Sequence, residues 1–502
     1  MKISAMKILP VLLLLLMLSA CGRSTPYEPA HGSAASYAND GTQPYNENTP
    51  PSSESTPSTS EATQEPEPSP STTDATPEPI PYSTTTPKPP PIRLMPYEPD
   101  YIPLIPRWEE GEPFLTEHFL CDFEYLMHTL RHNFPLFGPA YRRLGIDIDA
   151  IEAMTRDAIT TNNVLTPNRF SSVLRMFFFD QFGGFGHLYQ HWESRIHLVL
   201  ANIYRYSMDE DGSIINAYSQ RIYDIMRAPA AIRFYGNITV DLGEYESGRV
   251  DRNNISTNIL VPGEVAYINV RRFNHYNIDH DREIIFAFYE EIAGFNHLII
   301  DLQENLGGFP HYFYQLFVEP NITTGLEWRE LEFFPAGGNN LIFADALIGD
   351  IVTNDPGSAT LYYNGPDFIA ENDMKYFNPD DMNMLHNLVA WHHRIDPIAT
   401  EKAFDGKIWV LVGPMTQSAA EAIAIFIRET GFATLVGQPT AGIMGAISAY
   451  LLLPNSGIIV RYDLGYMTDS YGRSFEELGV MPHYFSHPGM SALETALEII
   501  GD

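Results

Sequence analysis

The chain has 502 residues, and its 30 Lys and Arg against 63 Asp and Glu give a formal net charge of −33 at pH 7. Such an acidic chain repels a phosphate backbone, which argues against nucleic acid as a partner. Its two cysteines are too few for a disulfide framework or a cysteine-based metal site.

Residues 1–21 predict a lipoprotein signal peptide. Lys2 and Lys7 precede the apolar run VLLLLLML, which is typical of a secretory signal and too short for a transmembrane helix. The sequence LSAC, which ends at Cys21, resembles a bacterial lipobox. This resemblance implies that Cys21 carries a lipid and anchors the mature chain to the outer face of the cell membrane. The alternative is an ordinary cleaved signal with an incidental cysteine.

Residues 22–95 are rich in Ser, Thr, Pro and Glu and contain few aliphatic residues. Such a segment cannot bury enough apolar surface to offset the entropy lost on ordering. We therefore expect a disordered, proline-stiffened tether that holds the folded part away from the membrane, through or above a cell wall.

Residues 96–190 predict an N-terminal helical region. The runs HFLCDFEYLMHTLRHNF and DIDAIEAMTRDAI have apolar residues at three- and four-residue spacing, and a third helix is expected over Asn168–Phe179. Residues 191–262 predict a small mixed segment that contains β-structure. Its β-like runs are IHLVLANIY and AAIRFY.

Strands alternate with helices in residues 263–502, which predicts an α/β core with a partly parallel sheet. The predicted strands are VAYINV, HLIIDL, KIWVLV and ATLVG, and the predicted helices include REIIFAFYEEIAGF and MSALETALEII. AISAYLLL and GIIVRYDL predict a hairpin with a loop of three or four residues. Ligands of such sheets bind beyond the carboxyl ends of the strands, here after Asp301 and before Ser418.

Ser418 stands between a buried strand and a strongly apolar helix. A hydroxyl at that place lies where backbone N–H groups converge, and an acyl-transfer enzyme needs its nucleophile beside its oxyanion donors. Ser418 and Glu421 also match a helix capping box, so the alternative is that Ser418 only caps the helix. The glycine-rich turn DLQENLGGFP leaves the same edge of the sheet and allows N–H groups to approach a substrate.

In order and spacing, several segments resemble the C-terminal processing (tail-specific) protease family of serine peptidases. They are DFEYLMHTLRHNFPL with GIDIDAIEA, DLQENLGG, MTQSAAEAIA with ATLVGQPTAG, and GRSFEELGVMP. The resemblance spans most of residues 117–487 and implies a helical region followed by a ClpP/crotonase-like α/β protease core that acts on a peptide or protein. Because the chain lacks HExxH, Walker, GxGxxG and GxSxG motifs, we expect neither a metal nor a cofactor.

Many members of this family use a lysine twenty-five residues after the serine. Ile443 occupies that position here, and no lysine follows Lys407. The chain therefore resembles the branch similar to the tricorn core protease, in which His and Glu accompany Ser. The family often carries a PDZ-like substrate domain, but the space for one is barely sufficient, so a preference for free C-termini is not carried over.

The resemblance to that branch implies His187 as the general base and Glu476 as the acid that orients it. His191 and Glu477 are the alternatives for the two roles. The N–H groups of Gly307 or Gly308 and of Ala419 would then form the oxyanion hole.

The sequence thus predicts an extracytoplasmic, lipid-anchored serine peptidase. One alternative is a non-catalytic, peptide- or ligand-binding surface lipoprotein on the same scaffold. Another is a structural or adhesive surface protein in which Ser418 only caps its helix.

Overall fold

The computed structural model describes residues 107–501, except 210–211, 241–249, 355–356, 363, 383 and 445–446. The predicted signal peptide with Cys21 and the predicted tether lie outside the described residues. All described residues fall within one unit of the chain. None of the helices formed by these residues is long and apolar enough to cross a membrane.

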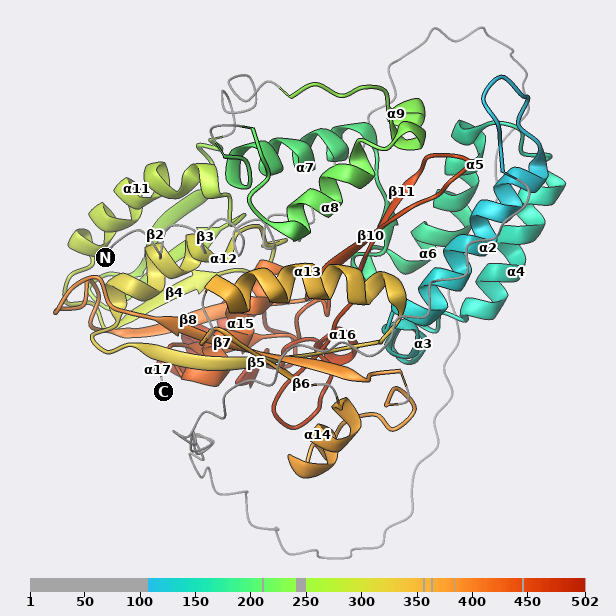
Figure 1. Ribbon diagram of the computed structural model, residues 1–502. Coiled ribbons are helices and arrows are strands. Elements are labelled where there is room, and N and C mark those ends of the chain that lie inside the picture. Colours follow the sequence, from blue (N-terminus) through green and yellow to red (C-terminus); the bar gives the residue numbers. More distant parts are fainter. Residues whose placement is uncertain are drawn as a thin grey trace, which may run out of the picture. The chain divides into compact units, whose positions relative to one another are not determined.

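The predicted N-terminal helical region is confirmed (Figure 1). Asp147 caps one helix by accepting from the N–H groups of Asp149 and Ala150, and Thr166 caps the next one, which has Pro167 in its first turn. The predicted third helix consists of an α-helix followed by a π-helical stretch. The elements are α2 (Thr116–Asn133), α3 (Phe137–Leu144), α4 (Ile148–Thr161), α5 (Pro167–Leu174), η1 (Arg175–Phe179), α6 (Asp180–Phe182) and η2 (Phe185–His187).

The β-like runs predicted within residues 191–262 are wrong, because both are helical. The run IHLVLANIY lies in a helix whose residues Ile196, Leu200 and Ile203 are buried against the helical region, a spacing that fits a helix face. Tertiary packing thus overrides the β-propensity of these residues. The elements are α7 (Glu193–Tyr206), α8 (Ala217–Met226), α9 (Pro229–Tyr235) and β2 (Ile255–Val261).

The predicted α/β core is confirmed as a six-stranded sheet in the order β13-β9-β8-β4-β3-β2. Its strands are parallel except β2, which is antiparallel to β3. Successive residues of β8 face opposite sides: Val410 packs toward α11 and α15, and Leu411 toward α17. The elements are β3 (Val265–Val270), η3 (His275–Asn277), α11 (Ile278–Glu291), β4 (His297–Asp301), α12 (Pro310–Phe313), β8 (Lys407–Val412), α15 (Ala419–Thr430), β9 (Thr434–Gly437), β13 (Tyr484–Phe485) and α17 (Ala492–Gly501).

A four-stranded antiparallel sheet that was not predicted from the sequence takes three of its strands from the segment between β4 and β8 and the fourth, β12, from the segment after β11 (Ile459–Asp463). Its order is β12-β5-β7-β6, and α13 packs against it within the same hydrophobic core. The elements are η4 (Tyr314–Val318), η5 (Glu319–Asn321), β5 (Leu326–Phe334), α13 (Gly338–Asn354), β6 (Ala359–Tyr362), α14 (Gly365–Glu371), β7 (Asn387–Ile395), β12 (Tyr466–Thr468) and α16 (Phe475–Leu478).

The predicted hairpin is confirmed as β10 (Ser448–Leu452) and β11 (Ile459–Asp463), joined by a four-residue loop. Figure 1 shows this red hairpin between the green helices α8 and α9 and the blue-green helical region. β11 also pairs with β1 (Tyr189–Gln190), which gives a three-stranded sheet. The buried carboxylate of Asp122, on α2, accepts from the N–H groups of Asn455 and Ser456 and so holds the hairpin loop. Burial raises the pKa of Asp122 to about 6.

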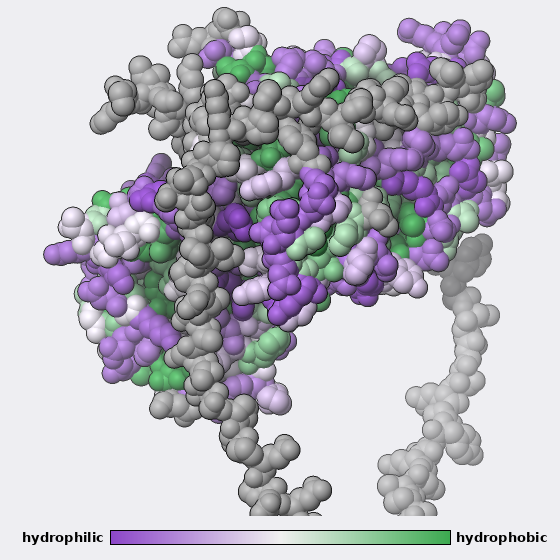
Figure 2. Space-filling view, turned by 60° about the horizontal axis from the view of Figure 1, so that its bottom comes forward, coloured by the Kyte–Doolittle hydropathy of each residue, from purple (hydrophilic) through white to green (hydrophobic). Residues whose placement is uncertain are grey.

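On the face that Figure 2 shows, hydrophobic residues are scattered among hydrophilic ones. A distribution of this kind is normal for a protein surface. The candidate site is instead formed by buried polar groups at the place where the two larger sheets and the hairpin meet.

Candidate active site

Ser418 lies at the strand-to-helix turn between β8 and α15. Its backbone has φ 53° and ψ −123°, a conformation that residues with a side chain rarely adopt. The residue is fully buried, and its side chain makes no capping hydrogen bond. The capping interpretation of Ser418 is therefore wrong. A strained turn between a strand and a helix is also the geometry that presents the nucleophile of α/β-hydrolases.

The predicted partner in the capping box, Glu421, has a different contact. Its carboxylate accepts from Thr440 Oγ1 (2.5 Å), Gly442 N (2.7 Å) and Ile443 N (2.6 Å). The carbonyl oxygen of Ile443 in turn accepts from the N–H of Ser418 at 2.7 Å. Glu421 thus fixes the loop at Gly442 and Ile443, and this loop in turn fixes the strained turn at Ser418. Burial raises the pKa of Glu421 to about 7, although these hydrogen bonds oppose the shift.

The glycine turn after β4 packs directly against the Ser418 turn. A Cβ atom at Gly307, which has φ 87°, would lie 2.6 Å from the carbonyl oxygen of Gln417, 2.8 Å from Ala419 N and 2.9 Å from Ser418 Cβ. Only glycine fits such an approach. The structure therefore brings together the predicted nucleophile and the backbone of two of the three predicted oxyanion donors, Gly307 and Ala419.

The two glycines differ in how their N–H groups are used. The N–H of Gly307 donates to Asn305 Oδ1 at 2.8 Å. Gly308 lies opposite Phe273 in a parallel bridge whose hydrogen bonds are made by the residues that flank Gly308, so its own N–H points away from Phe273. Gly308 is therefore the better placed donor of the pair.

His187 lies at the end of η2, just before β1. It is fully buried and has φ 44°, so it is also in the left-handed region. The preceding Gly186 has φ 58°, and a Cβ there would lie 2.7 Å from Phe134 and Leu136 side-chain atoms. The glycine therefore allows the tight turn that buries the imidazole.

The acid at the His187 ring is Asp463, the last residue of β11. His187 Nδ1 lies 2.5 Å from Asp463 Oδ2, and both side chains are buried. The sequence predicts Glu476 in this contact, so the prediction of the Nδ1 partner was wrong. The sequence GIIVRYDL predicts an apolar strand, and this prediction assigns no catalytic role to Asp463.

Glu476, on α16, is nevertheless buried in the same neighbourhood. Burial raises its pKa well above the ordinary value, and the charges of Asp463 and Glu421 raise it further. Its side chain accepts from Ser474 Oγ at 3.3 Å. Glu476 is thus a buried neighbour of the site, and its predicted place at His187 Nδ1 is taken by Asp463.

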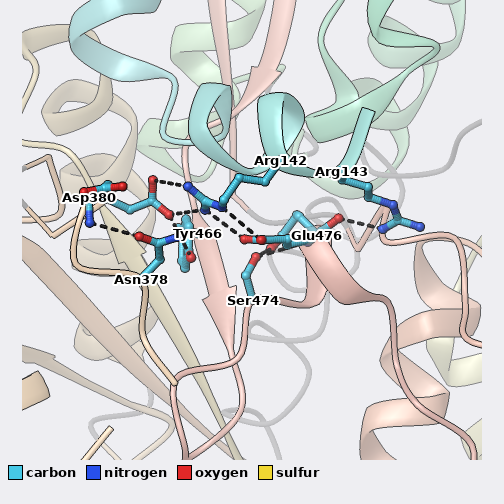
Figure 3. Close-up of polar contacts among 9 residues, drawn as sticks. Arg142, Arg143, Asn378, Asp380, Tyr466, Ser474 and Glu476 are labelled. Carbon is cyan, nitrogen blue, oxygen red and sulfur yellow. Dashed lines mark hydrogen bonds and ion pairs between the residues drawn. The ribbon is translucent and has the colours of Figure 1, made fainter. Parts of the chain in front are cut away.

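The helical region reaches α16 through two arginines of α3, as Figure 3 shows. Arg143 Nη1 donates to the backbone oxygen of Glu476 at 2.6 Å. Arg142 pairs with Asp381 and with Glu477, the alternative acid, at 2.5 and 2.8 Å. Glu477 thus belongs to an ion-pair network rather than to the pocket that holds Glu476.

The contacts of His191, the alternative base, are typical of a structural residue. Its ring stacks on Tyr450 with centroids 5.6 Å apart, and its backbone N–H donates to the carbonyl oxygen of Ile459. Burial lowers its pKa well below the ordinary value, and the charges of Arg195 and Arg461 lower it further. These contacts favour His187 over His191 as a base.

A short series of residues connects the Ser418 turn with the contact between His187 and Asp463. Ile443, which accepts from the N–H of Ser418, precedes Ser448 by five residues, and Ser448 Oγ donates to Asp463 Oδ1 at 3.4 Å. Asp463 in turn binds His187. Among the described residues, no group of three or more His, Cys, Asp or Glu could hold a metal ion.

Residues 264–485 match the model of peptidase family S41. A comparison with curated proteins finds no match.

Among solved structures, a putative peptidase from Parabacteroides merdae is 13% identical, covers 77% of this chain and 96% of its own, and has a TM-score of 0.44. Mature CPAF complexed with lactacystin is 14% identical over 77% of this chain and 97% of its own, with a TM-score of 0.42. The photosystem II D1 C-terminal processing protease is 14% identical over 53% and 54%, with a TM-score of 0.29. These likenesses are too weak to carry conclusions about the site.

Proposed function

We propose that the chain, whose residues 264–485 match the model of peptidase family S41, is a serine-type peptidase that hydrolyses peptide bonds outside the cytoplasm while anchored by a lipid. Ser418 attacks the carbonyl carbon of the substrate. His187 accepts the proton of the hydroxyl and returns it to the leaving amine.

The observation that carries this proposal is the strained, buried turn at Ser418 with the glycine turn seated against it. Strain of this kind persists only where the surroundings enforce it, and it concentrates at functional sites. Here the Ile443 carbonyl and the Glu421 carboxylate provide that enforcement. A serine that served only a structural purpose would not need such a backbone.

The oxyanion of the tetrahedral intermediate is held by the N–H groups of Ala419 and Gly308. Ala419 is the first residue of α15, where the helix dipole adds to the attraction for negative charge. Gly307 contributes by shaping the turn, since its own N–H is bonded to Asn305. Preorganised donors of this kind contribute about 3 kcal/mol each to catalysis.

A fluorophosphonate probe tests the proposal directly. The folded chain should be labelled at Ser418, and Ser418→Ala should abolish labelling. His187→Gln should slow labelling by roughly a thousandfold or more, because the hydroxyl loses its base. No labelling, or equal labelling of Ser418→Ala, would instead support the non-catalytic binding protein.

The lipid anchor is tested separately. Cys21→Ser should move the protein from the membrane fraction to the soluble fraction of its cells, without loss of peptidase activity per molecule. Intact membrane retention of Cys21→Ser would contradict lipid attachment at Cys21.

A further inference from the structure

The His187–Asp463 contact is built by strand register. β1 and β11 are antiparallel, with Tyr189 opposite Arg461. Continued by two residues, the same register places His187 opposite Asp463. β10 completes the arrangement, because Ser448 pairs with Asp463 on the other side of β11. Asp463 is thus held by backbone pairing to β10, and His187, which ends η2 just before β1, is brought beside it by the pairing of β1 with β11.

A buried cation supports the Asp463 carboxylate. Arg461 is fully buried, and its Nη2 lies 3.7 Å from Asp463 Oδ1. Arg461 Nε also donates to Ser448 Oγ (3.0 Å), and Nη1 donates to the Tyr189 hydroxyl (3.0 Å). A buried guanidinium requires a compensating negative charge, and Asp463 supplies one. The guanidinium thus places a positive charge beside the carboxylate that contacts the His187 ring.

Asp463 also interacts electrostatically with several buried neighbours. The charge of Asp463 contributes to the raised pKa values of groups on four neighbouring elements, which are Glu332 on β5, Glu476 on α16, Tyr218 on α8 and Tyr450 on β10. Burial is the largest cause in each case. Asp463 is therefore a negative charge that acts on several buried neighbours, and its Oδ2 lies 2.5 Å from His187 Nδ1.

We propose that Asp463 is the positioning residue that fixes the tautomer of His187, with Arg461 as its counter-ion. This inference rests on the proposed function for its kinetic consequence. Asp463 accepts the Nδ1 proton, so that Nε2 presents its lone pair for the proton of the nucleophile. Asp463 also stabilises the imidazolium that forms during the reaction.

The test compares Asp463→Asn with Glu476→Gln, since both changes remove one buried carboxylate and preserve its size. Asp463→Asn should lower kcat about 10²–10⁴-fold with little change in KM, because an amide favours the wrong tautomer. Its kcat/KM should also reach half its maximum at a lower pH, since the ring loses a negative neighbour. Glu476→Gln should lower kcat less than about tenfold and retain the pH profile.

Proton NMR supplies a readout that does not depend on turnover. The far-downfield resonance of a His Nδ1 proton held by a carboxylate should be present in the wild type and in Glu476→Gln, and absent in Asp463→Asn. Loss of the signal in Glu476→Gln alone would overturn the proposal. If the wild type gives the signal but neither turnover nor probe labelling, the proposed function fails while the Asp463 contact stands.

Asp463→Glu covers the case in which Asp463→Asn does not fold. It keeps a carboxylate opposite the ring and should retain the NMR signal and at least a tenth of the wild-type kcat. Complete loss of both, in a protein with the wild-type circular dichroism, would contradict a positioning role for the carboxylate.

Discussion

The turn that carries Ser418 and the three-stranded sheet that carries His187 are stabilised in different ways. The turn of the proposed nucleophile runs from the end of β8 to the start of α15, and the glycine turn after β4 and the loop at Ile443 lie against it. The proposed base contacts Asp463, 276 positions away, through the pairing of β1 with β11. Short sequence patterns therefore mark the nucleophile turn and its glycine turn, whereas the contact of the base depends on long-range strand pairing.

The two regions also belong to different hydrophobic cores. α15 packs in the core of the six-stranded sheet, with α11 and α12. β10 and β11 pack in the core that contains α2, α7 and α8. The site lies where these cores meet, so its two halves should respond differently to mutation.

Ser418 gives the largest expected effect on the local half. Ser418→Ala and Ser418→Gly should both abolish hydrolysis. Ser418→Gly should be more stable than Ser418→Ala by about 1 kcal/mol, because glycine adopts the positive φ without strain. Urea unfolding of the two variants measures this difference. Equal stability would mean that the turn stores no strain.

Gly307→Ala should come next, with hydrolysis reduced about a hundredfold and stability lowered by about 1–3 kcal/mol. The new Cβ would lie 2.6 Å from the backbone oxygen of Gln417, which cannot move aside without moving Ser418. Gly263→Ala is the matched control, because Gly263 also has positive φ (77°) but nothing within 4 Å of an added Cβ. Similar losses of activity in both variants would show that φ, and not the contact with the nucleophile turn, is responsible.

Glu421→Gln should have a smaller effect that depends on pH. The pKa of Glu421 is raised to about 7 in the folded protein, so the folded state binds the proton more tightly than the unfolded state does. Its contribution to stability therefore falls as pH rises through the window up to about 7, by at most about 3 kcal/mol. Glu332 and Asp122, raised to about 7 and about 6, contribute with the same sign.

Urea unfolding of wild type and Glu421→Gln at pH 5 and pH 8 isolates the Glu421 contribution. The variant should show a smaller loss of stability between the two pH values. Its activity at pH 8 should fall about tenfold, because a neutral amide accepts the loop N–H groups less strongly than a carboxylate does. An unchanged pH dependence would mean that Glu421 is ionised in both states.

The ion pairs outside the site give the smallest expected effects. Arg142→Ala should lower stability by about 1 kcal/mol, since it leaves the partly buried Asp381 and Glu477 without their partner. Arg394→Ala, which removes exposed pairs with Glu327 and Asp396, should change stability much less than Arg142→Ala does, because solvent screens exposed ion pairs. Thermal unfolding compares the two. A larger loss for Arg394 would contradict the ranking by burial.

The sequence predicted most reliably what depends on neighbouring residues. Strands β3, β4, β8 and β9 of the six-stranded sheet, the Ser418 turn and the glycine turn follow from short patterns, whereas β2 and β13 were not predicted. Asp463 could not be recognised, because its role depends on the pairing of β11 with β1 and a single acid at the end of an apolar strand carries no signal. The run IHLVLANIY was mistaken for β-structure because its β-branched residues also fit the buried face of a helix.

The buried carboxylate of Asp122 links α2 to the hairpin that ends in Asp463. Both α2 and His187 precede residue 264, where the match to the peptidase family begins. A truncated protein that started at residue 264 would keep the proposed nucleophile and oxyanion donors but would lack His187, the proposed base. The proposed catalytic unit is thus larger than the segment that matches the family model. Residues 264–485 alone do not contain every residue that the proposed hydrolysis needs.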